Sequence, residues 1–538
     1  MFKTIDSKSY KIACLVMLIL LFLSAIMPYY AEPYCSNIWQ DLMVQIKSGR
    51  WILENKQFMT ADVFSWHEGL EWCPHEIGWY VLSALLYNAG GVYAIYAFGF
   101  IMCSIMLVCI VIYNRNHSVV SNIIAFCAFG LTATISLYNI RPHTISVPIM
   151  SIFILVLLND KISDIIKSVI FIASAFIMSW FHGGMIPLIF VIYAVYMLIC
   201  LVLKQFRSTL TSFVSLVVGF GVSLLNPIGF DIWTYASTQS QTTVWNHIDE
   251  WNPGIFSMKF MFFVAVAVIG FCLKSGLKNF NKKALLQTAY LCMFAIMFAR
   301  YRRFYILFAL MFFIASPAAF DAIFEWLASH FKIGALAAYK IRECLEKEKV
   351  VSISAYSMLV VGLAAAIVSV MSVFCLVETL PENDINKVAE KAGYPMAVVN
   401  EIKDKGYERI FNSYNAGAWL LYNDIKVSQD NRCDPYLKQF SGDDYICMSI
   451  NTYKAFSEYV DKFKPDALVL EYTDGSNELA AVLDALDSDK YNITFRYDTI
   501  PRGVFVSDET LEASLAVSSE KEIAERTVHW IIAEISYD

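Results

Sequence analysis

Long apolar segments follow one another along most of this chain, and they constrain the fold more than any other feature. They lie near residues 12–31, 92–113, 118–138, 143–159, 165–181, 185–203, 209–226, 256–273, 283–299, 303–320 and 351–376. A helix needs about 20 apolar residues to cross a bilayer, and these runs approach that length. Only 17% of the residues are charged, which is low for a soluble globule. The sequence predicts a polytopic α-helical membrane protein with about eleven transmembrane helices.

Two other classes do not fit this sequence. The first apolar run ends in "IMPYYAEPYC", without a small-residue cleavage site, so we interpret it as a membrane helix and not as a signal peptide. The net charge is −7, and there is neither a basic tail nor zinc-finger spacing. Nucleic acid is therefore excluded as a partner.

Basic residues collect in alternate loops between the apolar runs. They are Lys3, Lys8, Lys11, Arg115, Lys161, Lys167, Lys204, Arg207, Lys274, Lys278, Lys282, Lys283, Lys332, Lys340, Arg342, Lys347 and Lys349. Loops rich in lysine and arginine stay on the cytoplasmic side of a membrane. We therefore expect a plasma-membrane protein with a cytoplasmic N-terminus, and we place residues 32–91, residues 227–255 and everything after 377 outside the cytoplasm.

One basic cluster breaks this rule. "FARYRRFYILF" contains Arg300, Arg302 and Arg303 between two apolar runs, on the outer side of the predicted topology. One interpretation is an anchor for phospholipid headgroups. The other is a clamp for one anionic headgroup, because the planar guanidinium donates paired hydrogen bonds to phosphate and stays charged.

The first outer segment begins with an amphipathic helix at residues 38–54. Asp41 lies in it, shortly after the first apolar run. Asp41 is either a solvated helix residue or a carboxylate that accepts a proton from a hydroxyl or orients a metal. The short apolar stretch "IGWYVLSALLYNAGG" that follows ends at Gly90 and Gly91, and we interpret it as an interfacial or re-entrant helix.

Further polar side chains occur where outer loops meet apolar runs. They are His75 and Glu76 in "CPHE", Arg141 and His143 in "IRPHTIS", His182 in "WFHGGM" and Glu250 in "IDEWNPG". Each has a local alternative; Glu76, for example, also suits a helix N-terminus. Taken together they indicate a site that faces outward, because the inner loops carry mainly lysine.

The composition becomes that of a soluble domain after Val377. "KPDALVLEY", "YNITFRYDTI" and "GVFVSD" are typical of strands, "SNELAAVLDAL" of a helix, and "KEIAERTVHWIIAEI" of a final amphipathic helix. We predict a transmembrane domain at residues 1–377, which includes the outer loop 32–91, and an extracytoplasmic α/β domain at residues 378–538. The second domain has no phosphate-binding loop and no nucleophile elbow.

Two pairs of cysteines lie outside the apolar runs. Cys35 and Cys73 flank the first outer segment, and Cys433 and Cys447 lie close together near the C-terminus. Each pair forms a disulfide or stays reduced, and the spacing alone leaves both states open.

Several outer motifs together resemble a known family. They include "QDLMVQIKSGRWILENKQFMTADVFSWHEGLEWCPHEIGWYVLSALLY", "IRPHTIS", "FHGG", "LLNPIG", "DEWNP", "ARYRRFYILFAL", "RIFNSYNAGAWLLY" and "QDNRCDPY". In this order they resemble the GT-C superfamily of polytopic glycosyltransferases, and most of all little-characterised bacterial members that are similar to protein O-mannosyltransferases. The resemblance covers nearly the whole chain.

The resemblance implies a sugar transfer at the outer membrane face from a polyprenyl-phosphate-linked donor. Asp41 matches the acidic residue of the first outer loop that acts as base or orients the acceptor, and Arg300, Arg302 and Arg303 match the basic residues that hold the lipid phosphate. Metal-using members carry a DxD sequence where this chain has "QDLM", so we expect no cofactor, with a divalent metal as the open alternative.

The resulting hypothesis is an inverting glycosyltransferase of the bacterial cell envelope, a hexosyl- or pentosyltransferase with catalytic Asp41. His75, Glu76, Arg141, His143, His182, Glu250 and the arginines bind substrate. Its partners are the lipid-linked donor, membrane lipids and a glycan, lipid or protein acceptor. The alternative is a non-catalytic membrane protein that binds or moves a polyprenyl-linked glycan, or an envelope-assembly scaffold.

Overall fold

A computed structural model shows how the chain folds. It describes residues 4–31, 39–137, 140–239, 253, 259–330, 349–351, 363, 367, 370, 383–436, 453–473, 490–501, 512, 515–516, 518–519, 522–523 and 526–537. The chain forms two compact units. The first unit consists of Met1–Ala31, Ala97–Gly229 and Trp245–Val377, and the second of Glu32–Tyr96, Phe230–Val244 and Glu378–Asp538. The predicted outer loop 32–91 thus folds with the C-terminal part of the chain.

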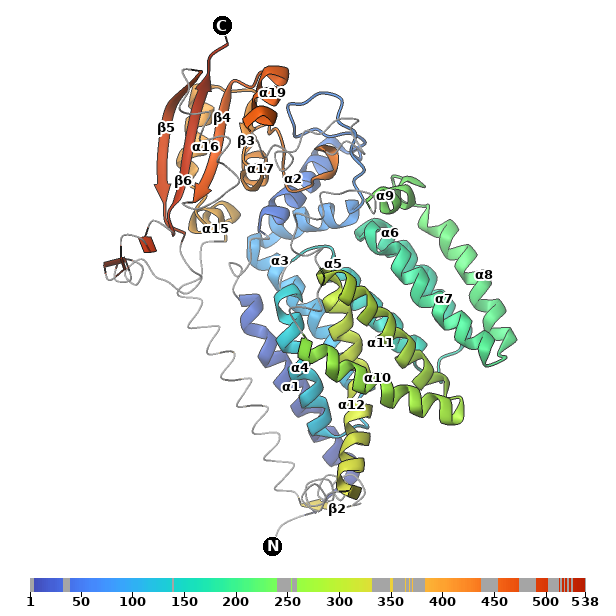
Figure 1. Cartoon of the computed structure of the whole chain (residues 1–538). Helices are drawn as coiled ribbons and strands as arrows, with labels where there is room; N and C mark the ends of the chain where they lie inside the picture. The colour runs from blue at the N-terminus through green and yellow to red at the C-terminus, as the bar shows by residue number, and fades with distance from the viewer. Residues whose placement is uncertain are drawn as a thin grey trace. The chain divides into compact units, whose positions relative to one another are not determined.

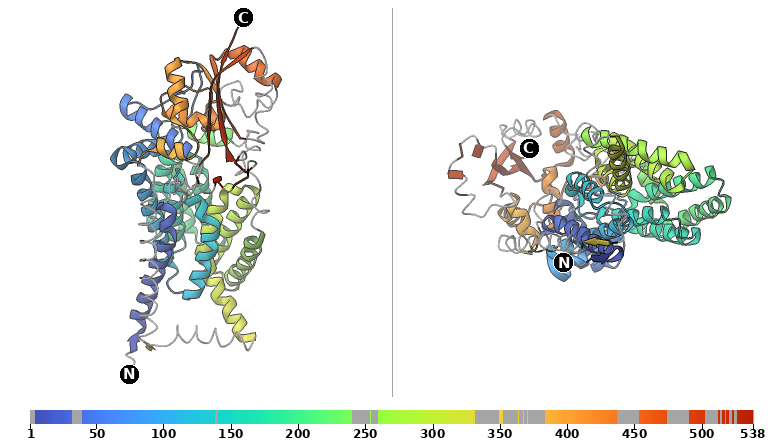
Figure 2. Two further views of the ribbon diagram at one scale, coloured as in Figure 1. Left: turned by 90° about the vertical axis from the view of Figure 1, so that its left-hand side faces the viewer. Right: turned by 90° about the horizontal axis from the view of Figure 1, so that it is seen from below.

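The first unit is helical (Figures 1 and 2). Its helices are α1 (Ser7–Ala31), α4 (Val119–Leu137), α5 (His143–Leu157), α6 (Asp164–Phe181), η1 (Gly183–Met185), α7 (Ile186–Val202), α8 (Phe206–Ser223), α10 (Lys259–Asn279), α11 (Lys282–Arg300), η5 (Arg302–Phe304) and α12 (Tyr305–His330). Strands β1 (Thr4–Asp6) and β2 (Lys349–Val351) pair antiparallel. Helix α12 packs on α4, and α6 packs on α8.

The apolar runs from 12–31 to 303–320 each coincide with a described helix. Six stretches of the described chain are long and apolar enough to cross a membrane: Ile77–Tyr113, Asp164–Phe181, Gly183–Val202, Phe206–Ser223, Lys282–Arg300 and Arg302–Phe324. The chain is therefore a multi-pass membrane protein. The total of about eleven spans stays a prediction, and the run 351–376 lies outside the described residues apart from three positions.

Helix α8 shows why these segments are stable in a bilayer. Its exposed face carries large apolar side chains such as Phe213 and Val217, while Ser215 and Gly219 are buried. A Cβ atom at Gly219 would lie 2.6 Å from the Phe171 ring of α6, so only glycine permits this approach. Small residues at helix contacts and apolar residues outside are the pattern expected in lipid.

Helix α3 (Ile77–Tyr113) begins in the second unit and continues into the first. Its backbone leaves the helical conformation at Gly90 and at Gly91, where φ is +66°. Glycine adopts positive φ without a steric penalty, and other residues rarely do. The predicted helix end at Gly90–Gly91 therefore appears as a break within a longer helix.

The second unit is built on a four-stranded sheet in the order β3-β4-β6-β5 (Figure 1). The strands are β3 (Ile410–Asn412), β4 (Ala467–Thr473), β5 (Tyr491–Thr499) and β6 (Val528–Ile535). Strand β3 is parallel to β4, and β6 is antiparallel to β4 and β5. The remaining elements are α2 (Trp39–Asn55), α9 (Asp231–Gln239), α15 (Ile385–Lys391), α16 (Met396–Lys405), α17 (Tyr414–Tyr422), η6 (Asp434–Tyr436) and α19 (Tyr453–Phe463).

The prediction of a final helix in "KEIAERTVHWIIAEI" is wrong for its second half, which forms the central strand β6. Trp530, Ile531, Ile532 and Ala533 are all buried, because side chains on both faces of this strand are covered. Burial on both faces gives a continuous apolar run that lacks the alternation of a surface strand. Such a run cannot be distinguished from a buried helix by periodicity.

Other predictions for the second unit have mixed outcomes. Helix α2 matches the predicted amphipathic helix 38–54, and β4 and β5 match two predicted strands. The predicted helix at 476–486 and the predicted strand at 503–508 lie outside the described residues. One side of the sheet packs against α19 through a core that includes Phe411, Phe456 and Leu468.

Candidate functional site

Asp41 lies in the first turn of α2 in the second unit. It is partly exposed, while Leu42 and Met43 beside it are buried. The Nδ2 group of Asn431 donates a hydrogen bond to Asp41 Oδ1 over 3.4 Å. The N-terminal end of the helix dipole favours a negative charge at this position. Asp41 is thus an ionisable carboxylate, open to solvent on one side and bound by an amide on the other.

A chain of hydrogen bonds leads away from Asn431. Its Nδ2 group also donates to Gln40 Oε1 at 3.0 Å, and Gln40 Nε2 donates to Tyr394 Oη at 3.0 Å. Tyr394 in turn donates to both carboxylate oxygens of Glu471, at 2.9 and 3.1 Å. Burial raises the pKa of Glu471 to about 7, although the Tyr394 hydrogen bond acts to lower it. Glu471 lies on β4, so the chain joins the central sheet to Asp41.

Tyr414 and Cys433 also lie near Asp41. Tyr414 Oη and Cys433 Sγ are 2.7 Å apart. Burial raises the pKa of both groups, and the negative charge of Asp41 adds to this effect. Both groups are therefore neutral near pH 7, and Asp41 is the negative charge that they face.

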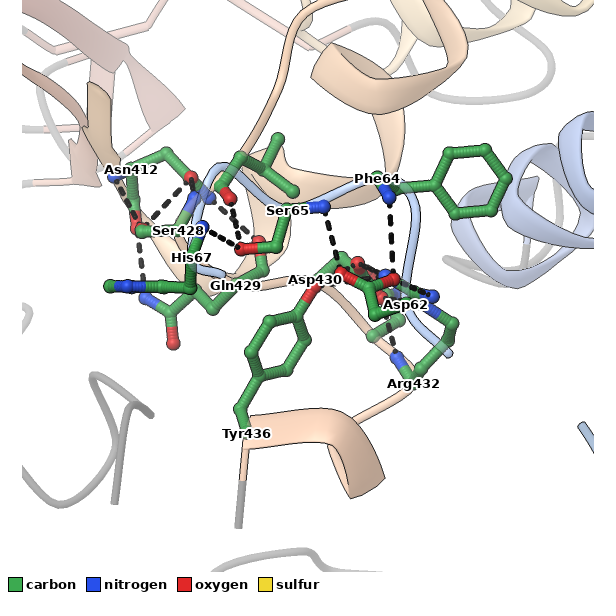
Figure 3. A network of polar contacts seen from close by, with 12 residues as sticks. Asp62, Phe64, Ser65, His67, Asn412, Ser428, Gln429, Asp430, Arg432 and Tyr436 are labelled. Atoms are coloured by element: carbon green, nitrogen blue, oxygen red, sulfur yellow. Dashed lines mark hydrogen bonds and ion pairs between the residues drawn. The ribbon is translucent and has the colours of Figure 1, made fainter. Parts of the chain in front are cut away.

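Asn431 is carried by a loop that the chain fixes firmly. Asn412, at the end of β3, accepts hydrogen bonds at Oδ1 from Ser428 N (2.9 Å) and Ser428 Oγ (3.1 Å), and its Nδ2 donates to Gln429 O (3.0 Å) (Figure 3). Gly417 of α17 permits close approach of this loop, since a Cβ atom there would lie 2.1 Å from Gln429 O. The motifs "RIFNSYNAGAWLLY" and "QDNRCDPY" thus form one structure.

The residues on either side of Asn431 form a buried ion network. Arg432 donates to Asp62 at 2.5 Å and to Asp430 at 2.5 and 2.8 Å (Figure 3). Its guanidinium lies 4.6 Å from the centre of the Trp72 ring. Burial acts to lower the Arg432 pKa, but the two carboxylates outweigh it and hold the pKa above its usual value. This network fastens the first outer segment to the C-terminal loop.

His75 and Glu76, both predicted to bind substrate, lie together in a second polar cluster. His75 Nε2 is 3.5 Å from Glu76 Oε1 and 3.3 Å from Tyr235 Oη. Tyr235, on α9, donates to Asp434 Oδ2 at 2.6 Å. Burial acts to lower the His75 pKa, but the hydrogen bond and charge of Glu76, together with Asp434, raise it overall. The pKa of His75 therefore lies above its usual value, so this side chain keeps its proton to a higher pH than a free histidine.

Arg141, His143 and His182 belong to the first unit. His182 caps the end of α6, and its Nδ1 lies 2.7 Å from Ser146 Oγ on α5. Arg141 and His143 are partly buried at the start of α5. The structure thus joins His182 to the helix on which His143 lies. Glu250 lies outside the described residues.

The arginine cluster forms the connection between α11 and α12. Arg300 ends α11, and Arg302 and Arg303 begin the short helix η5. Arg300 and Arg302 are exposed, and Arg303 is partly buried. Arg300 lies over the Tyr301 ring, 5.0 Å from its centre. Two guanidinium groups are therefore accessible at one helix junction.

The structure describes one cysteine of each predicted pair. Cys73 and Cys433 are thiols in the structure, while Cys35 and Cys447 lie outside the described residues. Burial raises the pKa of Cys73 to about 12, so this thiol stays protonated. Within the part of the chain that the structure describes, no group of three histidine, cysteine or acidic side chains is arranged to hold a metal ion.

Several side chains of these clusters were not predicted from the sequence. Asn431, Tyr394, Glu471, Tyr235 and Asp434 are distant in sequence from the residues that they contact. The motif "QDNRCDPY" was the only signal, and it contains Asn431 and Asp434 without showing their partners.

Comparison with known proteins gives its result at the level of structure. No family profile and no curated protein sequence matches the chain. The oligosaccharyltransferase of Archaeoglobus fulgidus in its apo form is similar, with a TM-score of 0.54 and 11% identity over 90% of this chain and 73% of that one. AglB of that organism, in complex with an inhibitory peptide and a dolichol-phosphate, gives 0.53 and 11% over 89% and 73%. The complex with Zn and sulfate gives 0.51 and 11% over 96% and 88%.

The fold of this chain is similar to that of these oligosaccharyltransferase structures. The GT-C resemblance inferred from the outer motifs agrees with this similarity of fold and otherwise stays a prediction. The closer resemblance to protein O-mannosyltransferases stays a prediction. At 11% identity the likeness does not extend to the reaction or to its residues.

Proposed function

We propose that this protein is a glycosyltransferase that moves a sugar from a polyprenyl-phosphate-linked donor to an acceptor at the outer face of the membrane. The observation that carries the proposal is the partly exposed Asp41 carboxylate in the first turn of α2, held by Asn431. The fold supports it, since the similar AglB structure is a complex with a dolichol-phosphate. The proposal places the N-terminus in the cytoplasm and residues 378–538 outside.

In this proposal Asp41 acts on the acceptor. Its carboxylate deprotonates or orients an acceptor hydroxyl, which attacks the anomeric carbon of the donor and inverts its configuration. A general base of this kind contributes about 10²–10⁴ in rate. Solvent exposure on one side of Asp41 leaves room for the acceptor, and the Asn431 hydrogen bond restricts the carboxylate on the other side.

The arginine cluster acts on the leaving group. As the bond to the sugar breaks, the polyprenyl phosphate gains negative charge, which preorganised cations stabilise. The exposed Arg300 and Arg302 are suited to this role, since their guanidinium groups can donate paired hydrogen bonds to phosphate. Arg303 adds positive charge at the same junction.

The remaining predicted residues are assigned to the sugar and its phosphate. His75 and Glu76 belong to one polar cluster, and His182 is oriented by Ser146. Arg141, His143 and Glu250 complete the proposed set. No metal enters the proposed reaction, and a divalent ion stays the alternative. The sugar class, hexose or pentose, is not specified.

The experiment uses the purified full-length protein and two matched pairs of variants. Native mass spectrometry compares Arg302→Ala/Arg303→Ala with the control Lys204→Ala/Arg207→Ala, whose residues are exposed on the predicted cytoplasmic side. We expect a polyprenyl-phosphate or polyprenyl-phosphate-sugar adduct that only the first variant loses. The adduct mass identifies the donor for a transfer assay.

The transfer assay then compares Asp41→Asn with Asp424→Asn, which removes the charge of an exposed carboxylate in the same unit. We expect Asp41→Asn to lower the rate at least about 10²-fold and the control to leave it unchanged. Full activity of Asp41→Asn removes this residue from the mechanism. A bound lipid-linked sugar without transfer in the wild type favours the alternative, a non-catalytic protein that binds or moves the glycan or scaffolds envelope assembly.

A further inference from the structure

The hydrogen-bond chain between Glu471 and Asp41 has a fixed direction when Glu471 is ionised. A carboxylate only accepts, so the Tyr394 hydroxyl must donate to it. The oxygen of Tyr394 then accepts from the Gln40 amide nitrogen. The Gln40 carbonyl is left facing Asn431, whose nitrogen must point toward it.

The consequence reaches Asp41. Because the Asn431 nitrogen points toward Gln40, its second hydrogen is directed at Asp41 Oδ1. The side-chain amide oxygen of Asn431, Oδ1, is buried and has no hydrogen-bond partner among the described residues. The amide of Asn431 therefore leaves its own oxygen unsatisfied while it supplies both hydrogens to the chain.

Protonation of Glu471 removes the reason for this direction. A protonated carboxyl group donates, so Tyr394 can accept from it and donate to the Gln40 carbonyl after that amide rotates. The Gln40 nitrogen then faces Asn431 and favours the rotated amide there as well, with its oxygen toward Gln40. Asp41 no longer receives a hydrogen bond from the Asn431 nitrogen.

The geometry points to Glu471 as a positioning residue for Asp41: its ionisation state sets the direction of the intervening hydrogen bonds. Ionised Glu471 gives Asp41 a donor that holds the carboxylate in place and favours its charged form. Protonated Glu471 withdraws that donor. The consequence for catalysis rests on the proposed function of Asp41, but the coupling between the two carboxyl groups does not.

The surroundings of Glu471 make it a suitable sensor. Tyr394 is the titratable group that contacts its carboxylate, and no described lysine, arginine or histidine does so. Trp530 of β6 lies opposite Glu471 in the sheet. The backbone N of Glu471 donates to Ser413 Oγ at 2.9 Å. With no cation to oppose burial, the carboxyl titrates at about pH 7. Among the described groups near Asp41 at the other end of the chain, Tyr414 and Cys433 stay neutral in that range.

The same sheet provides a matched control. Tyr407 donates to Glu534 of β6 at 2.6 Å, so this pair reproduces the contact of Tyr394 with Glu471. Glu534 is 39% exposed, it lies 3.6 Å from Lys405, and no described contact joins it to Asp41. Glu534→Gln therefore makes the same chemical change on a neighbouring strand.

The test measures Asp41 directly and requires no substrate. Purified full-length protein is treated with a carbodiimide and an amine between pH 5 and pH 9, and peptide mass spectrometry quantifies labelling of Asp41 relative to the exposed Asp424. We expect the ratio to rise about threefold as the pH falls through about 7, because Asp41 then loses the donor that favours its charged form. Glu471→Gln and Tyr394→Phe should abolish the step, and Glu534→Gln should retain it.

Each outcome decides the inference. The same step in the wild type and in both Glu471→Gln and Tyr394→Phe overturns it, as does a ratio in the wild type that does not change with pH. Two variants guard against a local loss of structure in one of them, because Tyr394→Phe keeps the ring and removes only the hydroxyl. If the step behaves as expected while Asp41→Asn still transfers sugar, the coupling stands and the proposed function of Asp41 fails.

Discussion

The ion network and the hydrogen-bond chain to Asp41 use neighbouring residues of the same loop. They differ in whether a cation compensates their carboxylates. In the network, Arg432 lies between the carboxylates of Asp62 and Asp430, and every charge has a partner. In the chain, neutral amides and a phenol separate Asp41 from Glu471, with no cation in the hydrogen-bonded series. A compensated buried charge fixes structure, whereas an uncompensated one is able to change its protonation. The first arrangement suits a scaffold and the second a site.

The largest effect on stability is expected when the ion network is broken. Arg432→Met leaves two buried carboxylates without a cation, and removal of one partner from a buried ion pair typically costs about 3–5 kcal/mol. We expect a large fall in the melting temperature of the purified protein, measured by intrinsic fluorescence. Lys405→Met, which removes the exposed partner of Glu534, is the control and should have little effect. Equal melting temperatures would show that the network adds no stability.

The uncompensated side should respond with the opposite sign. Burial raises the pKa of Glu471 from 4.5 to about 7, so folding favours its protonated form and the ionised form lowers stability as the pH rises through this window. Glu471→Gln should therefore stabilise the protein at pH 8, by up to about 3 kcal/mol, and have little effect at pH 4. Melting temperatures at both pH values test the sign. A variant that is less stable at pH 8 contradicts the assignment of Glu471 as uncompensated.

A smaller effect on stability is expected at Gly417, which packs against the loop that both the ion network and the hydrogen-bond chain use. Gly417→Ala places a Cβ atom against the backbone of Gln429 and Asp430, with contacts of 2.1 and 2.7 Å to main-chain atoms. Accommodating an added group in such a tightly packed place lowers stability by about 1–3 kcal/mol. Gly406→Ala is unsuitable as a control because φ is positive there, so Ala418→Gly, also in α17, serves instead. The Asp41 labelling ratio should change in Gly417→Ala, since the loop that carries Asn431 must move.

The smallest effect on stability is expected at Asn431. Asn431→Ala removes two hydrogen bonds of the chain but takes no cation away from a buried carboxylate, so the loss should be about 1 kcal/mol or less. Labelling of Asp41 should nevertheless lose its step near pH 7. A stability loss as large as that of Arg432→Met would mean that the chain is part of the scaffold.

The sequence predicted the helical part of this fold well and the C-terminal part unevenly. Apolar runs identify membrane helices directly, because a helix satisfies its own backbone and needs only length and hydropathy. Strand β6 was missed because its central position buries both faces. The site followed the same division. Asp41 was predicted as a candidate from its place after the first apolar run, and its role stays a prediction. Tyr394 and Glu471 are linked to it only through contacts between distant segments, which one sequence does not show.

The loop from Val427 to Arg432 holds two parts of the second unit together, and its residue spacing also decides which side chain reaches which partner. The order of three neighbouring side chains decides what each one contacts. Asp430 and Arg432 complete the ion network, and Asn431 between them donates a hydrogen bond to Asp41. A deletion or insertion of one residue in this loop would place a charged side chain, in place of the amide, opposite Asp41. Homologous chains that keep this spacing while their other loops vary in length would mark it as the part of the outer unit that tolerates no change in register.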